Sequence, residues 1–388
     1  MSSIRGFARA LALALAAVSV QPFAATTLTV SNINDTGPGA LRSALAFAVS
    51  GDTIEFAPGV TGTIALGSTL TFTQSVNLNG PGAGSLVLDG QGTVRVIDIA
   101  AGTAPVLSGL TIANGNADAD AGGGVRNAGT LTVTDSIFTG NAAEIGGAII
   151  NAPGAALAME RCTFQNNTST FAGGAILTFG AVTVSDSTFS GNGAVRDGGV
   201  FDVQSSATAA VINSTFFGNH AGIAGGAIVA FGPVSIINST LAGNTADSGA
   251  AIYAQSASLI LHNNVITDNA STSTAGAVYR TGTAAFAASN DVFYNNTAAG
   301  IEDDQAGYGA SNFIVATAQP LGPLRDNGGP TQTMAPVFGG VAICAASAAL
   351  LPGGVSEDQR GLPRKNGSCL DAGSVQSDVI FNNGFEGG

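Results

Sequence analysis

Few side chains in this sequence could perform chemistry together. The nearest candidate is Arg196 and Asp197 at a turn, with Asp202 on the strand that follows. Glycoside hydrolysis needs two or more carboxylates converging on one bond, and a polysaccharide lyase needs a base such as Arg beside its carboxylates. Neighbouring repeats place no second carboxylate in register with Asp202, and none beside His262. We therefore interpret the group as a solvated turn and His262 as a surface residue, and we expect no catalytic residues.

Candidate metal ligands are equally sparse. Asp118 and Asp120 lie in a Gly-rich loop, and an acidic run occupies residues 302–304. Calcium takes six to eight oxygen ligands, so these acids could serve calcium only together with other groups. The two histidines, His220 and His262, come without a Cys-x-x-Cys pair from which a zinc site could be built. Metal-ligating residues therefore stay unassigned, and we expect no cofactor.

The three cysteines divide by position. Cys344 and Cys369 lie in the non-repetitive C-terminal region, and an oxidising compartment would allow them to pair. Cys162 stands alone inside a repeat, where a small buried residue is the ordinary interpretation. We predict a Cys344–Cys369 disulfide and no reactive thiol.

The N-terminal 25 residues are typical of a signal peptide. Arg5 and Arg9 precede a short apolar stretch over residues 11–20, and small residues follow Pro22. No later apolar run is long enough to span a bilayer, so we expect no transmembrane segment in the mature chain. The net charge of −13 disfavours nucleic acid, whose phosphates would be repelled. We expect a secreted protein, or one associated with the cell surface or outer membrane.

Two motifs recur together about every 25 residues. An apolar residue followed three positions later by Asn forms the first, and its Asn residues are Asn141, Asn167, Asn192, Asn219, Asn244, Asn269 and Asn296. Gly-Gly-Ala-Ile, at 146–149, 173–176 and 225–228, forms the second. Within each repeat apolar residues alternate, as in 130–134, which indicates short strands with one buried face. A propeller blade needs about 40–45 residues, so the period predicts an all-β, right-handed parallel β-helix.

Most motif residues then have structural tasks. Phe138, Phe164 and their equivalents should stack inside the coils, while the Asn residues line a corner as an amide ladder, where Asn tolerates left-handed geometry. A second polar column comprises Asp135, Arg161, Asp186, Asn213, Asn238, Asn263 and Asn290. We expect both columns to support the scaffold rather than form an active site.

The paired motifs resemble the repeats of the polymorphic outer-membrane protein family, over roughly residues 110–300. Segments 321–331 and 358–364 are similar to the choice-of-anchor Q module of bacterial exported proteins, although Thr333-Met334 and the stretch 371–374 depart from it. The resemblance implies a fold of the pectin-lyase-like superfamily. The expected organisation is a signal peptide at 1–25, an N-terminal cap with a short helix at 26–62, coils at 63–315, a C-terminal capping module at 316–376 and a tail at 377–388.

One outward-facing row is apolar, and we take it as a candidate binding strip, with cover by a loop as the alternative. It comprises Ile150, Leu177, Val229, Tyr253 and Tyr279. The sequence favours an exported, non-catalytic surface protein, adhesin-like or structural, whose partner is an unknown surface protein or glycan. The alternative is a carbohydrate-active enzyme, a polysaccharide lyase or glycoside hydrolase, which would need a groove lined by two carboxylates or by Arg with carboxylates.

Overall fold

The computed structural model describes residues 24–298, 313–364 and 369–377. Nearly all of the expected signal peptide, the acidic run 302–304 and the tail after residue 377 lie outside these residues. Within them, no helix has the length and apolarity needed to cross a membrane.

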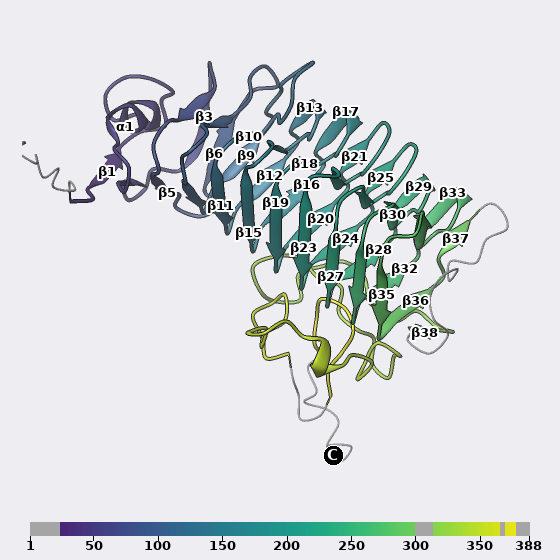
Figure 1. Cartoon of the computed structure of the whole chain (residues 1–388). Coiled ribbons are helices and arrows are strands. Elements are labelled where there is room, and N and C mark those ends of the chain that lie inside the picture. Colours follow the sequence, from purple (N-terminus) through teal and green to yellow (C-terminus); the bar gives the residue numbers. More distant parts are fainter. Residues whose placement is uncertain (1–23, 299–312, 365–368, 378–388) are drawn as a thin grey trace, which may run out of the picture.

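The described chain winds into a parallel β-solenoid with four sheets along its length (Figure 1). Sheet A contains β1 (Thr27–Val30), β2 (Thr53–Phe56), β5 (Asn77–Asn79), β8 (Val106–Ser108), β11 (Thr130–Thr134), β15 (Ala156–Glu160), β19 (Ala181–Ser185), β23 (Thr208–Ile212), β27 (Val234–Ile237), β31 (Leu259–His262) and β35 (Phe286–Ser289). Sheet B contains β3 (Gly62–Ala65), β6 (Leu86–Asp89), β9 (Thr111–Ala113), β12 (Ile137–Thr139), β16 (Thr163–Gln165), β20 (Thr188–Ser190), β24 (Thr215–Phe217), β28 (Thr240–Ala242), β32 (Val265–Thr267), β36 (Asp291–Tyr294) and β38 (Phe313–Val315).

The other two sheets complete each coil. Sheet C contains β4 (Leu70–Phe72), β7 (Ile97–Ile99), β10 (Val125–Asn127), β14 (Ile149–Asn151), β18 (Ile176–Thr178), β22 (Phe201–Val203), β26 (Ile228–Ala230), β30 (Ile252–Gln255) and β34 (Val278–Thr281). Sheet D contains β13 (Ala142–Ile145), β17 (Thr168–Ala172), β21 (Gly193–Ala194), β25 (His220–Ala221), β29 (Thr245–Ser248), β33 (Ala270–Thr274) and β37 (Thr297–Ala298). A coil from β11 onward passes through sheets A, B, D and C in that order.

Phenylalanine side chains of sheet B stack on one another in the interior of the solenoid. The Phe138 and Phe164 ring centroids lie 4.4 Å apart, and the stack continues to Phe189 at 5.0 Å and Phe216 at 4.9 Å. All four side chains are buried. Burying each ring contributes roughly 1.5–3 kcal/mol, so this column is a principal source of stability.

The repeated Asn side chains form a continuous amide ladder at the corner between sheets B and D. Asn141 Nδ2 donates to Asn167 Oδ1 over 2.9 Å, and the same bond recurs on every coil down to Asn296. Each Nδ2 also donates to a backbone carbonyl, such as that of Ile112 for Asn141. The left-handed geometry expected for these residues belongs instead to the residue before each of them, for example Gly140 with φ 63° and Asn166 with φ 54°.

A further ladder inside the A–B corner was not predicted. The backbone amide of Ser187 donates to Ser214 Oγ over 3.2 Å, and that of Ser214 donates to Ser239 Oγ over 3.1 Å. The column ends on Asn264 and Asp291, where Asn264 Nδ2 donates to Asp291 Oδ1 over 2.8 Å. The signal lies in the sequence, because a Ser or its equivalent follows each residue of the second polar column.

A short helix closes the N-terminal end of the solenoid, as the apolar spacing predicted. Helix α1 (Leu41–Phe47) packs beside β1 and β4, with Leu41 in the core. It lies at the same end of the molecule as β1 in Figure 1.

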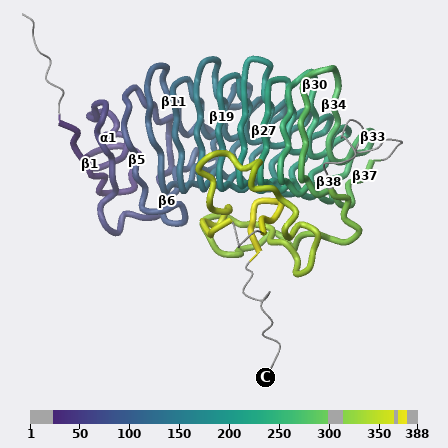
Figure 2. The backbone as a smooth tube through the Cα atoms, turned by 60° about the horizontal axis from the view of Figure 1, so that its bottom comes forward, coloured from purple at the N-terminus to yellow at the C-terminus, as the bar shows by residue number. Residues whose placement is uncertain are grey.

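The irregular C-terminal module, with one turn of 3₁₀ helix at Ala348–Leu350, lies along the side of the solenoid (Figure 2). A capping module, as expected from the sequence, would lie over the open end of the coils. Its contacts instead run along the A–B corner and the outer face of sheet B: Asn213 Nδ2 donates to Glu357 O, and Asn290 Nδ2 donates to Ala345 O. Three Asn side chains at this corner, those of Asn213, Asn263 and Asn290, supply the donors for this side attachment.

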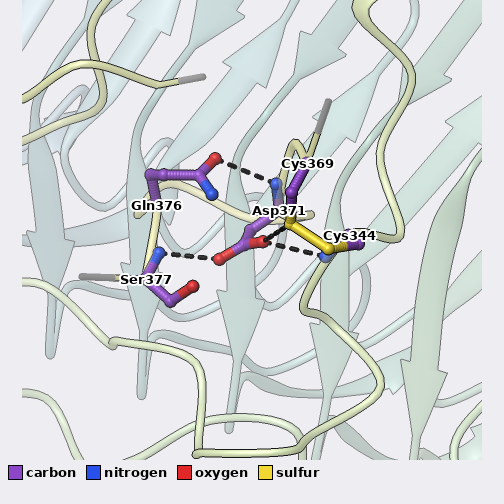
Figure 3. Close-up of a disulfide and its surroundings, with 5 residues drawn as sticks. All are labelled: Cys344, Cys369, Asp371, Gln376 and Ser377. Carbon is purple, nitrogen blue, oxygen red and sulfur yellow. Dashed lines mark hydrogen bonds between the residues drawn. A yellow bond between two sulfur atoms is a disulfide. The ribbon is translucent and has the colours of Figure 1, made fainter. Parts of the chain in front are cut away.

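A disulfide fixes the end of this module (Figure 3). Cys344 and Cys369 are bonded, and the Asp371 carboxylate accepts backbone N–H bonds from Cys344 at 2.8 Å and Ser377 at 2.7 Å. The disulfide and this carboxylate therefore tie three stretches of the module together. Cys162 is buried inside the coils, and this burial raises the pKa of its thiol to about 12, which makes it a packing residue.

Candidate functional site

The outward row of sheet C does not form an accessible binding strip. The predicted register is present, since Ile150 pairs with Leu177 and Val229 pairs with Tyr253. Ile150, Leu177 and Val229 are nevertheless buried. Residues at the D–C corner and the turn after sheet C, among them Ile145 and Phe179, pack against the first two.

Only the two tyrosines of the row remain partly open to solvent. The Tyr253 and Tyr279 rings lie 5.5 Å apart. On the preceding coil, Arg126 pairs with Ile150, while Asn127 Nδ2 donates to Asn151 Oδ1 in the interior. The row is therefore mainly ordinary packing, which was the alternative to binding.

One acid, Asp202, interrupts this apolar row, and a second, Asp197, lies at the corner before it. Asp202 is only 3% exposed, pairs in the sheet with Leu177 and Val229, and accepts a 2.6 Å hydrogen bond from Gln204 Nε2. Burial raises its pKa to about 7, with a further contribution from the Asp197 charge. Burial also raises the pKa of Asp197.

The arginine beside this pair faces another partner. The Arg196 guanidinium lies 4.6 Å from the centre of the Phe171 ring, and its Nε is 3.9 Å from Asp197 Oδ2. The group predicted to be a solvated turn is thus partly buried. A carboxyl group that titrates near neutral pH can act as a general acid or base, but the cover over Asp202 keeps it from a substrate in this conformation.

The remaining sequence candidates that the structure describes do not assemble into a metal site. Arg95 donates to Asp120 over 2.5 Å, whereas Asp118 accepts from Asn116 Nδ2 over 2.9 Å. His262 lies on β31, and burial lowers its pKa. Among the described residues, the one group with suitable spacing is Cys344, Cys369 and Asp371, whose sulfur atoms are joined in the disulfide.

A cleft of about 330 Å³ separates the A–B corner from the C-terminal module. Its lining includes Glu160, Asp186 and Glu357 together with Arg161, a set not anticipated from the repeats. Arg161 donates to both Asp135 oxygens at 2.7 and 2.9 Å and also to Glu160. Arg360 also lines the cleft and is paired with Asp358 over 2.9 Å. Because both guanidinium groups are ion-paired, the cleft offers little free positive charge to an anionic ligand.

A longer groove follows sheet D and the B–D corner. Two adjoining hollows of about 430 and 730 Å³ share Asn116 and Ala142 in their lining. The lining begins at Asp89 and continues over five successive coils to Val195. At about 4.8 Å per coil, it extends roughly 19 Å along the solenoid.

The groove lining is polar but contains no arginine. Its carboxylates are Asp89, Asp118 and Glu144, and its other polar side chains are Gln91, Asn114, Asn116, Thr168, Ser169 and Thr170. Gly and Ala form the remainder apart from Val195, so small side chains keep the floor low. The sequence reasoning missed this groove because its residues come from five coils and from the loop around Asp118, which the period alone does not align.

Comparisons with known proteins agree with this architecture. The family model for a right handed beta helix region matches residues 61–223. The chain is a right-handed parallel β-helix. The match specifies that fold and not the polymorphic outer-membrane repeat or the choice-of-anchor module, and no curated protein matches the chain.

Several solved structures are similar at low identity. An alginate lyase from Paenibacillus sp. str. FPU-7 is 15% identical, with 68% of this chain and 97% of that chain covered and a TM-score of 0.36. The cedar pollen allergen jun a 1 is 14% identical, with 72% and 81% covered and a TM-score of 0.31. The PL6 family alginate lyase AlyGC is 12% identical with a TM-score of 0.31; the similarity covers 92% of this chain but 60% of that enzyme.

Proposed function

We propose that this β-helix is an exported, non-catalytic scaffold that binds an uncharged glycan along the sheet D groove. The observation that carries the proposal is the continuous groove over five coils, lined by amides, hydroxyls and carboxylates. Carboxylates accept hydrogen bonds, hydroxyls can donate and accept, and amides do both through different atoms, which suits a ligand rich in hydroxyl groups.

Charge favours a neutral ligand over a polyanion. The groove lining has three carboxylates and no arginine, and the whole chain carries a net charge of −13. Arg95, at the base of the neighbouring loop, is already bonded to Asp120. A uronic polysaccharide would therefore meet repulsion along the groove, whereas an uncharged chain would not.

We propose that the groove is not catalytic because two acids with raised pKa values lie outside it. Asp197 and Asp202, whose pKa values burial raises, are not part of the groove lining. Asp202 lies on the covered face of sheet C, and Asp197 lies at the corner before it. Export is proposed from the signal-like residues 1–25, and attachment to the cell surface from the resemblance to the polymorphic outer-membrane repeats and the choice-of-anchor module.

The test measures binding by the exported protein to insoluble neutral polysaccharides and to a glycan array. Ala142→Arg places a long charged side chain at the junction of the two hollows, so we expect at least a tenfold loss of affinity. Thr183→Arg, on the exposed face of sheet A, is the matched control and should bind as the unmodified protein does. Equal binding by both variants, or no glycan binding by any of them, would refute the groove as a glycan site.

A carbohydrate-active enzyme is the second candidate, favoured by Asp202 with its pKa near 7 beside Asp197. Opening of the cover over sheet C would expose an acid suited to proton transfer near neutral pH. New ultraviolet absorbance on uronic polysaccharides, or reducing ends released from neutral ones, would reveal turnover. Loss of such turnover in Asp202→Asn would establish this reading and exclude the non-catalytic one.

A further inference from the structure

The N-terminal end of the solenoid carries an apolar groove beside a projecting aromatic side chain. The groove has a volume of about 540 Å³, and its lining includes Leu28 of β1 and Ala44 and Phe47 of α1. Phe47 is 80% exposed although it lies on the same helix as the buried Leu41. A large exposed apolar side chain next to an apolar hollow is typical of a contact surface rather than of a solvated end.

The strand at this end also has a free edge. Among the described strands, β1 pairs with β2 and ends sheet A. The carbonyls of Thr26 and Val30 accept hydrogen bonds from the backbone amides of Thr53 and Ala57, on the β2 side. Because backbone groups alternate along a strand, the N–H and C=O groups of Thr27 and Thr29 face the open edge. Such an edge is a template for another strand.

We propose that a second copy of this chain docks at this end, with β1 pairing with its counterpart across a two-fold axis. The patch contains both the projecting ring and the hollow that could receive it, as a self-complementary two-fold contact requires. None of the residues lining the groove is charged, whereas the chain has a net charge of −13. The groove lining itself therefore adds no charge repulsion between two like-charged molecules that approach through it.

Two substitutions test the separate parts of the contact in the exported protein, with the mass measured by light scattering over a range of concentrations. Phe47→Glu places a charge where the ring would be buried. Thr29→Pro removes the N–H on the open edge and leaves the β2-facing bonds intact, as proline is tolerated on edge strands. We expect the unmodified protein to be a dimer. For each variant, we expect the dissociation constant of the dimer to be at least tenfold larger.

Phe338→Glu is the matched control, because Phe338 is 88% exposed on the distant C-terminal module. It should dimerise as the unmodified protein does. Thermal unfolding of all variants checks that each is folded. A monomeric unmodified protein overturns the proposal, as does a dimer that survives both Phe47→Glu and Thr29→Pro.

Discussion

At the A–B corner, the same backbone position recurs on successive coils. On some coils this position is open to solvent, and on others the C-terminal module covers it. Every residue in the column from Asp135 to Asn290 has a φ between 49° and 60°. Asp135, Arg161 and Asp186 face solvent or the 330 Å³ cleft. The four asparagines that follow lie where the C-terminal module covers the corner, and the side chains of three of them bond to it directly.

This difference separates two requirements on the same position. The left-handed backbone favours Asn, Asp or Gly over other residue types. The surroundings then select among them, because a charge remains hydrated on the open coils, while an amide satisfies both donors and acceptors of a covering chain. The change from charged residues to Asn thus marks in sequence where the module attaches.

The first prediction concerns Arg364, a residue that joins the C-terminal module to the covered part of the corner. Arg364 is fully buried, and its guanidinium donates to Asn213 Oδ1 at 3.0 and 2.8 Å and to the carbonyls of Asn238 and Gly373. Arg364→Met leaves these acceptors buried without a partner, so we expect unfolding to become easier by about 3–5 kcal/mol. Urea unfolding measures the loss, and limited proteolysis should show early cleavage of the module.

Arg161→Met is the control for this prediction. The Arg161 side chain is 35% exposed and its ion pairs are screened by solvent, so the change should cost less than about 1 kcal/mol. An equal loss for the two variants would mean that cover by the module does not distinguish the two halves of the column.

The second prediction compares glycine at an open and a covered coil, since glycine keeps the left-handed backbone. Asn263 donates to Ser347 O at 3.1 Å and accepts from the Ser347 amide at 2.9 Å. Asn263→Gly removes both bonds and should destabilise by about 2 kcal/mol. Asp135→Gly loses only an exposed ion pair and should change stability by less than about 1 kcal/mol. Thermal unfolding of both variants tests the ranking, and the reverse order would contradict it.

The third prediction concerns the covered residue that breaks the pattern. Asn238 is fully buried, yet its Oδ1 and Nδ2 have no hydrogen-bond partner. Asn238→Gly removes two unsatisfied polar atoms and keeps the backbone geometry, so we expect stability to rise by about 1 kcal/mol. A loss as large as that of Asn263→Gly would show that the amide contributes to docking after all.

Sequence reasoning was successful where one coil repeats another. The period predicted the β-helix, and the alternating strands and the Phe–Asn spacing lie in register on successive coils. Each coil contacts mainly its neighbours, so local pattern determines these features. The burial of Ile150 depends on residues at the corners and turns of the coils, such as Ile145 and Phe179, which the motif spacing alone does not place. The side attachment of Arg364 depends on a segment that packs onto the coils from outside the period.

The candidate groove shows the same limit. Asp89, Asn116 and Val195 line one surface only because five coils stack and the loop around Asp118 rises beside them. Their order in the sequence carries no signal of that proximity. By contrast, the inner serine column could have been found, since its members occupy a fixed place after each corner residue.

The last prediction concerns Asp186, at the border between the two halves. It accepts a 3.1 Å hydrogen bond from Asn213 Nδ2, and burial raises its pKa. The folded chain therefore holds a proton at pH values where the unfolded chain has released it, so the contribution of Asp186 to stability falls as pH rises from its ordinary pKa through the raised one. Asp186→Asn has no titrating carboxyl at this position, so its stability should change less with pH over that window. Asp135→Asn is the opposite control, because the Arg161 guanidinium lowers the pKa of the native Asp135 carboxyl. Denaturant unfolding at a series of pH values measures both slopes, and equal slopes for Asp186→Asn and the unmodified protein would place Asp186 with the solvent-facing half of the corner.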